Sequence, residues 1–460
     1  MVFRETIVKF LCTFSRMKDE MFLTANLRCR YKTKNLIMKL LPFFVPSCKK
    51  CLSLLLLLTF SVYAFAQSSR VKKAVFIIVD GVAADLMEKL PVPNLHAIAK
   101  EGGYTRAYVG GIKGTYSETP TISAVGYNSV LTGTWVNKHN VWDNDIAAPN
   151  YNYYTIFRYC KMQYPQKKTA IFSSWQDNRT KLVGDNFPAT GNIPVDYHYD
   201  GLELDTVNFP QDKKRDFMSK IDESVATHAA DYIRQNAPDL SWVYLEYTDD
   251  MGHMHGDGPD YYNAIALADK RVGYVWEAIQ YREKHFNEDW LIIVTTDHGR
   301  DAKTGQGHGG QSDRERSSWI FTNAKNLNAE FHQPQASVVD IMPSLARFMN
   351  IAVPEENNRE VDGIPFTGKV SFTQPAYSQQ GSVINISWKA QEPTGDIKIW
   401  GSATNNFKTG SKDEYQLLKT VSIADQKATI HLPAEAKGFY KIFLQAKDNS
   451  ANYWIASPKK

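Results

Sequence analysis

The chain has 460 residues, of which 43% are hydrophobic and 22% are charged, with 53 Lys and Arg against 49 Asp and Glu. It contains no internal repeat or low-complexity segment, and its length predicts one large domain with a smaller one, since domains typically have about 100 to 200 residues. No basic stripe with interleaved aromatic residues is found, which excludes a nucleic-acid platform.

The first 66 residues are not expected in the working protein. Lys49 and Lys50 precede the apolar run Cys51–Ala64, and Ala64-Phe-Ala66 is a small-x-small cleavage signal. Residues 38–66 are therefore predicted to be a secretory signal peptide cut near Ala66, and residues 1–37 are interpreted as an upstream over-extension. The run is short for a membrane span, so no stable span is expected in the mature chain, with an uncleaved anchor as the alternative. We expect a periplasmic or secreted protein.

Removal of this segment changes the charge and the cysteine count. It leaves 42 Lys and Arg against 46 Asp and Glu, a net charge of −4, and of five cysteines it leaves only Cys160. No intramolecular disulfide is then available. An exported protein without one is expected to depend on its core and on bound metal.

From Lys73 to about Ile351, short apolar runs alternate with helical stretches. Strands are predicted at Ala74–Val79, Trp242–Tyr247 and Trp290–Thr296. Helices are predicted at Pro93–Gly102, Asp222–Asn236 and Tyr261–His285. This alternation predicts an α/β fold with a mostly parallel sheet that helices cover on both faces.

After Gly368 the pattern changes to strands without helices. They are expected at Val383–Trp388, Ile397–Trp400, Tyr415–Val421, Ala428–Leu432 and Tyr440–Ala446. Short strands separated by polar turns predict an all-β sandwich over residues 369–460, similar to a fibronectin type III or immunoglobulin-like module. Residues 67–368 would be the catalytic domain. Packing, carbohydrate contact and dimerisation are open as roles of the sandwich, and the oligomeric state is not predicted.

Acidic and imidazole side chains follow each of the three apolar runs. Open α/β sheets keep their sites at the carboxyl ends of the strands, so we expect these side chains to meet. Three carboxylates with three imidazoles suit zinc better than magnesium, and six ligands can hold two ions. Two Zn²⁺ are therefore predicted, with other divalent ions as alternatives. The ligand candidates are Asp80, Asp249, His253, Asp297, His298 and His308.

Each candidate also has a simpler interpretation. Taken alone, Asp80 is typical of a helix cap or turn, Asp297 with His298 of a buried hydrogen-bonded couple, and the glycine-flanked His308 of a loop. Arg300 and Arg316 could meet substrate charge, but arginines in polar loops are usually solvated. The occurrence of the whole set in one chain favours the metal site.

The hydroxyl-rich segment Thr119–Gly133 contains the candidate nucleophile. Ser123 opens a predicted helix N-terminus, where free amides and the helix dipole favour an anionic oxygen or a phosphate. Its hydroxyl could attack phosphorus and form a covalent intermediate that water later cleaves. Thr119 and Thr121 are the alternatives, because a helix-cap role explains any of the three hydroxyls.

Together these elements resemble the alkaline phosphatase superfamily, most closely its nucleotide pyrophosphatase/phosphodiesterase (type I phosphodiesterase) branch. The resemblance covers roughly Lys73 to Ile351 and rests on an ordered set of motifs. They are Val79-Asp80-Gly81, Leu131-Thr132-Gly133, Asn140-Val-Trp-Asp-Asn144, Asp249-x-x-x-His253, Thr296-Asp-His-Gly299, Gly307-His-Gly309 and Asp340-Ile-Met-Pro-Ser344.

The resemblance implies two three-residue zinc sites, Asp249/His253/His308 and Asp80/Asp297/His298. Ser123 would bridge towards the second ion as a further ligand, and Asn144 would bind a phosphoryl oxygen. The implied activity is that of an exported phosphodiesterase or nucleotide pyrophosphatase that acts on a small phosphate ester or a nucleotide.

One departure from the family pattern leaves the substrate open. Ser123 stands where phosphodiesterase relatives carry threonine and sulfatases carry a modified cysteine, and the usual Phe-Pro-Asn does not follow it. An alkaline phosphomonoesterase is therefore the main alternative, followed by a phosphonate hydrolase, a sulfatase and a non-catalytic binding protein. The Cys/Ser-x-Pro-x-Arg pattern of sulfatases is absent around Ser123, and the sequence does not identify the leaving group.

Overall fold

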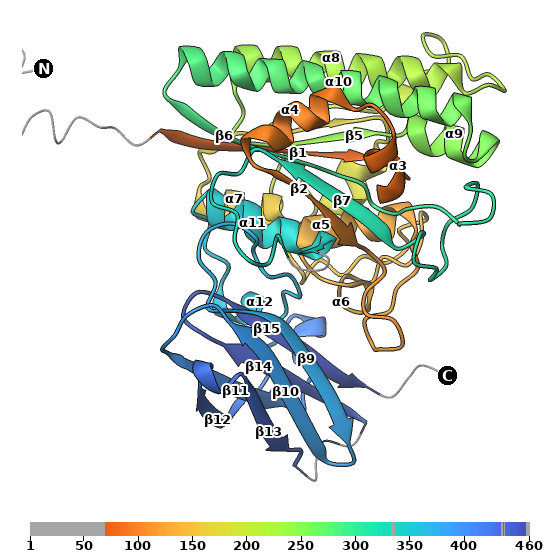
Figure 1. Cartoon of the computed structure of the whole chain (residues 1–460). Helices are drawn as coiled ribbons and strands as arrows, with labels where there is room; N and C mark the ends of the chain where they lie inside the picture. Colours follow the sequence, from red (N-terminus) through yellow and green to blue (C-terminus); the bar gives the residue numbers. More distant parts are fainter. Residues whose placement is uncertain (1–69, 333–335, 434–435, 437, 457–460) are drawn as a thin grey trace, which may run out of the picture. The chain divides into compact units, whose positions relative to one another are not determined.

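The structure is a computed structural model that describes residues 70–332, 336–433, 436 and 438–456 (Figure 1). Residues 70–460 form one compact unit. The predicted signal peptide and upstream extension lie outside the described residues, and so do four of the five cysteines. Cys160 is buried and free. Within the described ranges, no helix has both the length and the apolar character needed to cross a membrane.

An eight-stranded sheet lies at the centre of the N-terminal part, in the order β4-β3-β5-β1-β6-β7-β2-β8. β7 runs antiparallel to β6 and β2, and the other neighbouring pairs are parallel. The predicted mostly parallel sheet is therefore confirmed. The strands are β1 (Val71–Val79), β2 (Gly103–Tyr108), β3 (Thr169–Ser173), β4 (Tyr197–Tyr199), β5 (Leu240–Leu245), β6 (Glu288–Thr295), β7 (Ser317–Thr322) and β8 (Ala336–Ser337).

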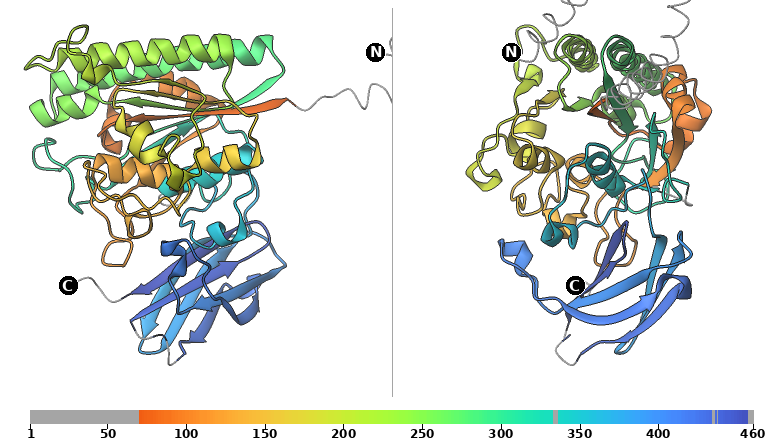
Figure 2. Two further views of the ribbon diagram at one scale, coloured as in Figure 1. Left: turned by 180° about the vertical axis from the view of Figure 1, so that it is seen from behind. Right: turned by 90° about the vertical axis from the view of Figure 1, so that its left-hand side faces the viewer.

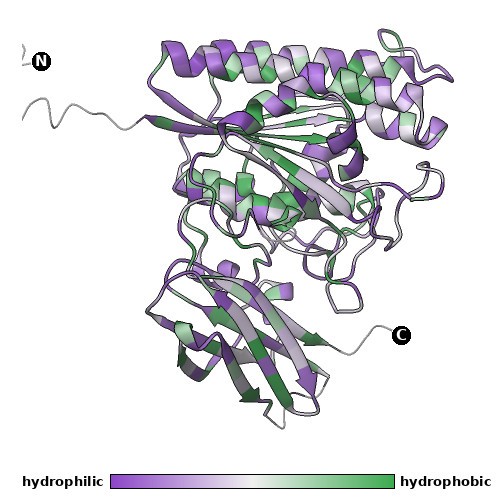
Figure 3. Ribbon diagram, in the orientation of Figure 1, coloured by the Kyte–Doolittle hydropathy of each residue, from purple (hydrophilic) through white to green (hydrophobic). Residues whose placement is uncertain are grey.

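Helices cover both faces of this sheet (Figures 1 and 2). On one face, Ala74, Phe76 and Ile78 of β1 pack into a hydrophobic cluster with α5 (Ser123–Thr132), α7 (Ile156–Gln163) and α11 (Ile341–Phe348). On the other face, the alternate β1 residues Val75, Ile77 and Val79 pack with α4 (Pro93–Glu101), α8 (Asp216–Asn236) and α10 (Pro259–His285). Burial from both sides explains the continuous apolar runs, visible in green in the sheet in Figure 3.

The three predicted helices are confirmed as α4, α8 and α10. α8 begins six residues before the predicted start, at Asp216, and α10 begins at Pro259, whose fixed φ suits the first turn. The other α-helices of the described residues are α3 (Ala84–Lys89), α6 (Val136–His139), α9 (Tyr247–His255) and α12 (Glu355–Asn358). The sequence pattern did not predict α9, which begins at Tyr247, inside the run assigned to a strand.

The C-terminal part contains a three-stranded sheet, β13-β10-β9, and a four-stranded sheet, β12-β11-β14-β15, both antiparallel. All five predicted strands are present, and β9 and β15 are additional. The sheets enclose their own hydrophobic cluster, but the domain boundary after Gly368 stays a prediction. The strands are β9 (Phe372–Gln380), β10 (Val383–Ala390), β11 (Asp396–Ser402), β12 (Gln416–Ser422), β13 (Lys427–His431), β14 (Phe439–Gln445) and β15 (Ser450–Ala456).

Two buried lysines join the C-terminal strands to the preceding segments. Lys138 Nζ lies 2.6 Å from Asp362 Oδ1 and 2.7 Å from Asn452 Oδ1. Lys441 Nζ lies 2.6 Å from both Glu360 Oε1 and Asp413 Oδ2. Buried charges are tolerated only when they are paired, so these contacts fix β14 and β15 against residues 360–362.

Candidate metal centre and active site

Three neighbouring parallel strands bring the ligand candidates to one edge of the sheet. Asp80 directly follows β1, and Asp297 and His298 follow β6 after one intervening residue. Asp249 and His253 lie one helical turn apart on α9, which begins two residues after β5 ends. Because β5, β1 and β6 are adjacent and parallel, their carboxyl ends coincide. The expected convergence of these side chains is therefore present.

The first ligand group consists of Asp80, Asp297 and His298, whose candidate donor atoms all lie within 4.8 Å of one another. His298 Nε2 is 3.5 Å from Asp80 Oδ1 and 3.3 Å from Asp297 Oδ2. All three side chains are buried, and neither of these two oxygens accepts a hydrogen bond from any described residue. A pair of buried carboxylates with free oxygens is costly without a cation, so the group fits a divalent ion.

The electrostatics of this group point the same way. Burial, together with the charges of Asp297 and Asp249, raises the pKa of Asp80 well above its usual value. Burial and the Asp249 charge raise the pKa of Asp297 to about 7. Both carboxyls therefore resist ionisation in the protein alone. A bound cation reverses this tendency, because it stabilises the charged form of each carboxylate.

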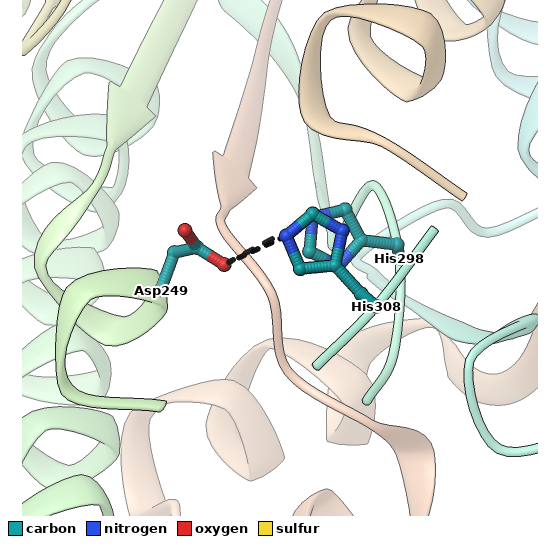
Figure 4. A group of neighbouring side chains, drawn as sticks. All are labelled: Asp249, His298 and His308. Atoms are coloured by element: carbon teal, nitrogen blue, oxygen red, sulfur yellow. Dashed lines mark ion pairs between the residues drawn. The ribbon is translucent and has the colours of Figure 1, made fainter. Parts of the chain in front are cut away.

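The second ligand group surrounds Asp249. Asp249, His298 and His308 lie within 4.8 Å of one another (Figure 4), and His308 Nε2 is 3.9 Å from Asp249 Oδ1. His253 Nε2 is 3.3 Å from Asp249 Oδ2 and 3.0 Å from His308 Nε2. The predicted set Asp249/His253/His308 is connected by these pairwise contacts, whereas the group whose donor atoms all lie within 4.8 Å of one another contains His298 in place of His253. His298 stacks on His308 with ring centroids 3.8 Å apart, which makes the two groups neighbours.

Backbone carbonyls fix the orientation of two of these histidines. His298 Nδ1 is 2.9 Å from Gly299 O, and His308 Nδ1 is 2.8 Å from Thr121 O. A carbonyl can only accept, so each Nδ1 carries the proton and each Nε2 keeps its lone pair. Burial lowers the pKa of both histidines, which favours the neutral, ligating form. By contrast, His139, which is not a ligand candidate, accepts a hydrogen bond from Val141 N with Nδ1, so its Nδ1 does not donate to a carbonyl.

Ser123 is the first residue of α5 and is 6% exposed. Its Oγ lies 3.2 Å from His298 Nε2. The next amide, Ala124 N, donates to Asn144 Oδ1 at 3.0 Å, so the NH₂ end of Asn144 is left as a donor close to the serine. The structure therefore places the predicted nucleophile and the predicted phosphoryl-oxygen ligand side by side at the N-terminus of a helix.

The two alternative hydroxyls are placed differently. Thr121 Oγ1 donates to Gly310 O at 3.0 Å and accepts from Gly309 N at 2.9 Å, so it holds the loop that carries His308. Thr119 Oγ1 is buried and has no hydrogen-bond partner among the described residues. The contact of Ser123 with a ligand candidate favours Ser123.

The interpretation of Arg300 as a solvated loop residue is wrong, because its side chain is fully buried. Nε donates to Gly81 O at 3.0 Å, Nη1 donates to Gln306 O at 3.1 Å, and Nη2 pairs with the Asp249 carboxylate. Burial alone would raise the pKa of Asp249, but the guanidinium holds it well below its usual range. Arg316 Nη2 donates to Gly111 O at 2.6 Å and so holds a loop.

The family model described as "Type I phosphodiesterase / nucleotide pyrophosphatase" matches residues 74–323, which is more than half of the chain. The chain belongs to this family. The family is the branch of the alkaline phosphatase superfamily that the motifs predicted, and the matched residues include every ligand candidate and Ser123.

Two curated relatives are similar to this member of the family. The catalytic subunit of GPI ethanolamine phosphate transferase 3 from Mus musculus is 23% identical over 221 residues, which cover 47% of this chain and 20% of that protein. Ectonucleotide pyrophosphatase/phosphodiesterase family member 5 from Homo sapiens is 24% identical over 233 residues, covering 50% of this chain and 45% of that protein. The matches therefore span less than half of each relative.

Among solved structures, murine ectonucleotide pyrophosphatase/phosphodiesterase 5 is similar, with 14% identity and a TM-score of 0.42 over 62% of this chain and 96% of that chain. A putative sulfatase from Bacteroides thetaiotaomicron has 11% identity and a TM-score of 0.47 over 76% of this chain and 85% of that one.

Proposed function

We propose that the protein is an exported, metal-dependent hydrolase of phosphoric esters, a phosphodiesterase or nucleotide pyrophosphatase that uses Ser123 as its nucleophile. The observation that carries the proposal is the meeting of three carboxylates and three imidazoles beside a serine at a helix N-terminus. Membership of the type I phosphodiesterase/nucleotide pyrophosphatase family supports the reaction class.

The residues present fit two divalent ions. Asp80, Asp297 and His298 would hold one, and Asp249, His253 and His308 would hold the other. This agrees with the unpartnered oxygens of Asp80 and Asp297 and with the Nδ1 protons of His298 and His308, which leave each Nε2 as the ligand atom. The mixture of oxygen and imidazole donors favours zinc. When bound, the ions supply positive charge that stabilises the attacking and leaving oxygens of an in-line displacement.

The chain's own residues prepare the attack. Ser123 Oγ would form a bond to phosphorus as the bond from phosphorus to the leaving oxygen breaks, and water would then cleave the phosphoserine. The first turn of α5, where the helix dipole favours an anion, and the Asn144 NH₂ group would bind non-bridging oxygens. Burial of Ser123 limits the access of bulk water during the first step.

The nucleophile is tested by Ser123→Ala with the matched control Ser129→Ala. Ser129 is buried on the same helix, where its hydroxyl donates to Val125 O at 2.8 Å, away from the ligand groups. With metal content verified, we expect Ser123→Ala to lose about 10³-fold or more in kcat on a nitrophenyl nucleotide diester, as removal of other hydrolase nucleophiles does. Ser129→Ala should stay within a few-fold of the parent. Parental activity in metal-loaded Ser123→Ala would refute the proposed nucleophile.

Substrate class and export need separate measurements. Comparison of kcat/KM for nitrophenyl phosphate with that for the nitrophenyl nucleotide diester distinguishes a phosphodiesterase, for which we expect the diester to be faster, from a phosphomonoesterase. We also propose that residues 38–66 are removed on export, so N-terminal sequencing of the native protein should begin at Gln67. A mature chain that retains this segment would contradict the proposed cleavage.

A further inference from the structure

Two tyrosines outside the ligand set hold one oxygen of Asp80. Tyr244 donates its hydroxyl to Asp80 Oδ2 at 2.6 Å, Tyr127 donates to the same oxygen, and the two hydroxyl oxygens are 2.8 Å apart. Both rings are buried and meet edge to face, with centroids 4.9 Å apart. Oδ2 is therefore fully engaged. Oδ1 has no hydrogen-bond partner among the described residues and faces His298.

The tyrosines come from two elements that frame the site. Tyr244 is the second-last residue of β5. Tyr127 lies on α5 four residues after Ser123, and side chains at this spacing share one face of a helix. The hydrogen bond from Tyr127 thus connects the helix of the nucleophile to the strand that carries Asp80.

Neutral donors have a different electrostatic effect from a cation. A hydroxyl fixes the orientation of a carboxylate but leaves its negative charge available, whereas a guanidinium cancels much of that charge. Asp249 has an arginine partner and Asp80 has two tyrosines. The two hydroxyls therefore orient the Asp80 carboxylate, and once a cation ionises it they leave its charge uncancelled, with Oδ1 free.

We propose that Tyr127 and Tyr244 are positioning residues of the metal centre, which lock the Asp80 carboxylate so that Oδ1 alone faces the ion. This inference rests on the proposed function, because it requires that Asp80 bind metal. The simpler alternative is that the two hydroxyls only satisfy a buried carboxylate. In that case their loss would reduce the stability of the fold and leave metal affinity unchanged.

The test compares Tyr127→Phe, Tyr244→Phe and the double variant with Tyr159→Phe. Tyr159 is a matched control, since it is equally buried and its hydroxyl bonds to the Asn357 side chain, outside the ligand groups. Zn²⁺ affinity is measured by competition with a chromophoric chelator, and the melting temperature is measured on metal-free protein. Loss of an outer partner of a metal ligand typically reduces affinity by about 10- to 100-fold. We expect about 10-fold for each single variant, more for the double variant, and no change for the control.

Unchanged Zn²⁺ affinity in both single variants and the double variant would overturn the positioning role. A drop in melting temperature alone, similar to that of the control, would have the same meaning. If the double variant does not fold, the two single variants decide the question against the control. A parent protein that binds no divalent ion would instead overturn the proposed function, so the two failures are distinguishable.

Discussion

A methyl group added at Gly126 would test how closely α5 must approach the strand that carries the ligands. Gly126 lies on α5, three residues after Ser123. A Cβ at this position would lie 2.6 Å from the backbone oxygen of Asp297 and 2.7 Å from its Cβ, whereas ordinary contact begins near 3.4 Å. The helix and the Asp297 segment would therefore have to separate by about 0.8 Å, because both contacts involve atoms that no rotamer change can move.

The expected effect on activity is larger than the effect on stability. Overpacking costs about 1–3 kcal/mol, and the better helix propensity of alanine offsets about 1 kcal/mol of it. Ser123 moves with the helix, and a displacement approaching 1 Å in a reacting group can cost about 10²-fold in rate. We therefore expect Gly126→Ala to lose about 10- to 100-fold in kcat/KM while it remains folded at 25 °C.

The assay measures kcat/KM on the nitrophenyl diester together with metal content and melting temperature. Gly258→Ala is the control, because its φ is −172° and a Cβ there would meet its nearest neighbour at an ordinary 3.9 Å. It should match the parent in rate. Parental kcat/KM in metal-loaded Gly126→Ala would show that α5 can shift without displacing Ser123, and the reasoning would fail.

Two further predictions concern ionisable groups away from the catalytic residues. Burial and the Asp340 carboxylate raise the pKa of Glu330 to about 8, so the folded state keeps a proton that the unfolded chain releases. The stability of the fold should consequently decrease as pH rises from about 4.5 to 8. Glu330→Gln should reduce the decrease in melting temperature between pH 5.5 and 8.5. The same decrease in the parent and in Glu330→Gln would contradict the assignment. Lys441→Met leaves two buried carboxylates without their cation and should cost about 3–5 kcal/mol in urea unfolding. Lys412→Met, at a lysine whose side chain is 78% exposed, should cost less than about 1 kcal/mol, and equal costs would contradict this argument.

Much of the site was predictable because it lies at strand ends. The apolar runs before Asp80 and Asp297 are typical of strands buried on both faces, and parallel neighbours bring their carboxyl ends together. Ser123 was predictable for a related local reason, since it opens a helix directly. In the C-terminal part, β9 and β15 were missed because β9 is mostly polar or exposed and contains Pro375, and β15 is interrupted by polar residues.

The contacts that orient the ligands were not predictable, because each depends on groups distant in the chain. Arg300 interacts with Gly81, Asp249 and Gln306, and Tyr127 and Tyr244 contact Asp80 from a helix and a strand. In the sequence, an arginine after a strand is typical of a solvated loop and a tyrosine in an apolar run is typical of core. Glycines allow some of these close contacts because they have no Cβ, but the sequence does not show which glycines do so. At Gly252, for example, a Cβ would lie 2.4 Å from Arg300.

These contacts also give the two ligand groups different electrostatic surroundings. Each group has three candidates, and the sequence treats them alike. In the structure, the Asp80 and Asp297 carboxylates share one neutral histidine and have no cationic partner among the described residues, whereas Asp249 is paired with Arg300. A cation is therefore needed most strongly at the group that also contacts Ser123 through His298. The guanidinium lowers the negative charge of the second group, so its ion would be held more weakly, on the side where His253 is half-exposed to solvent.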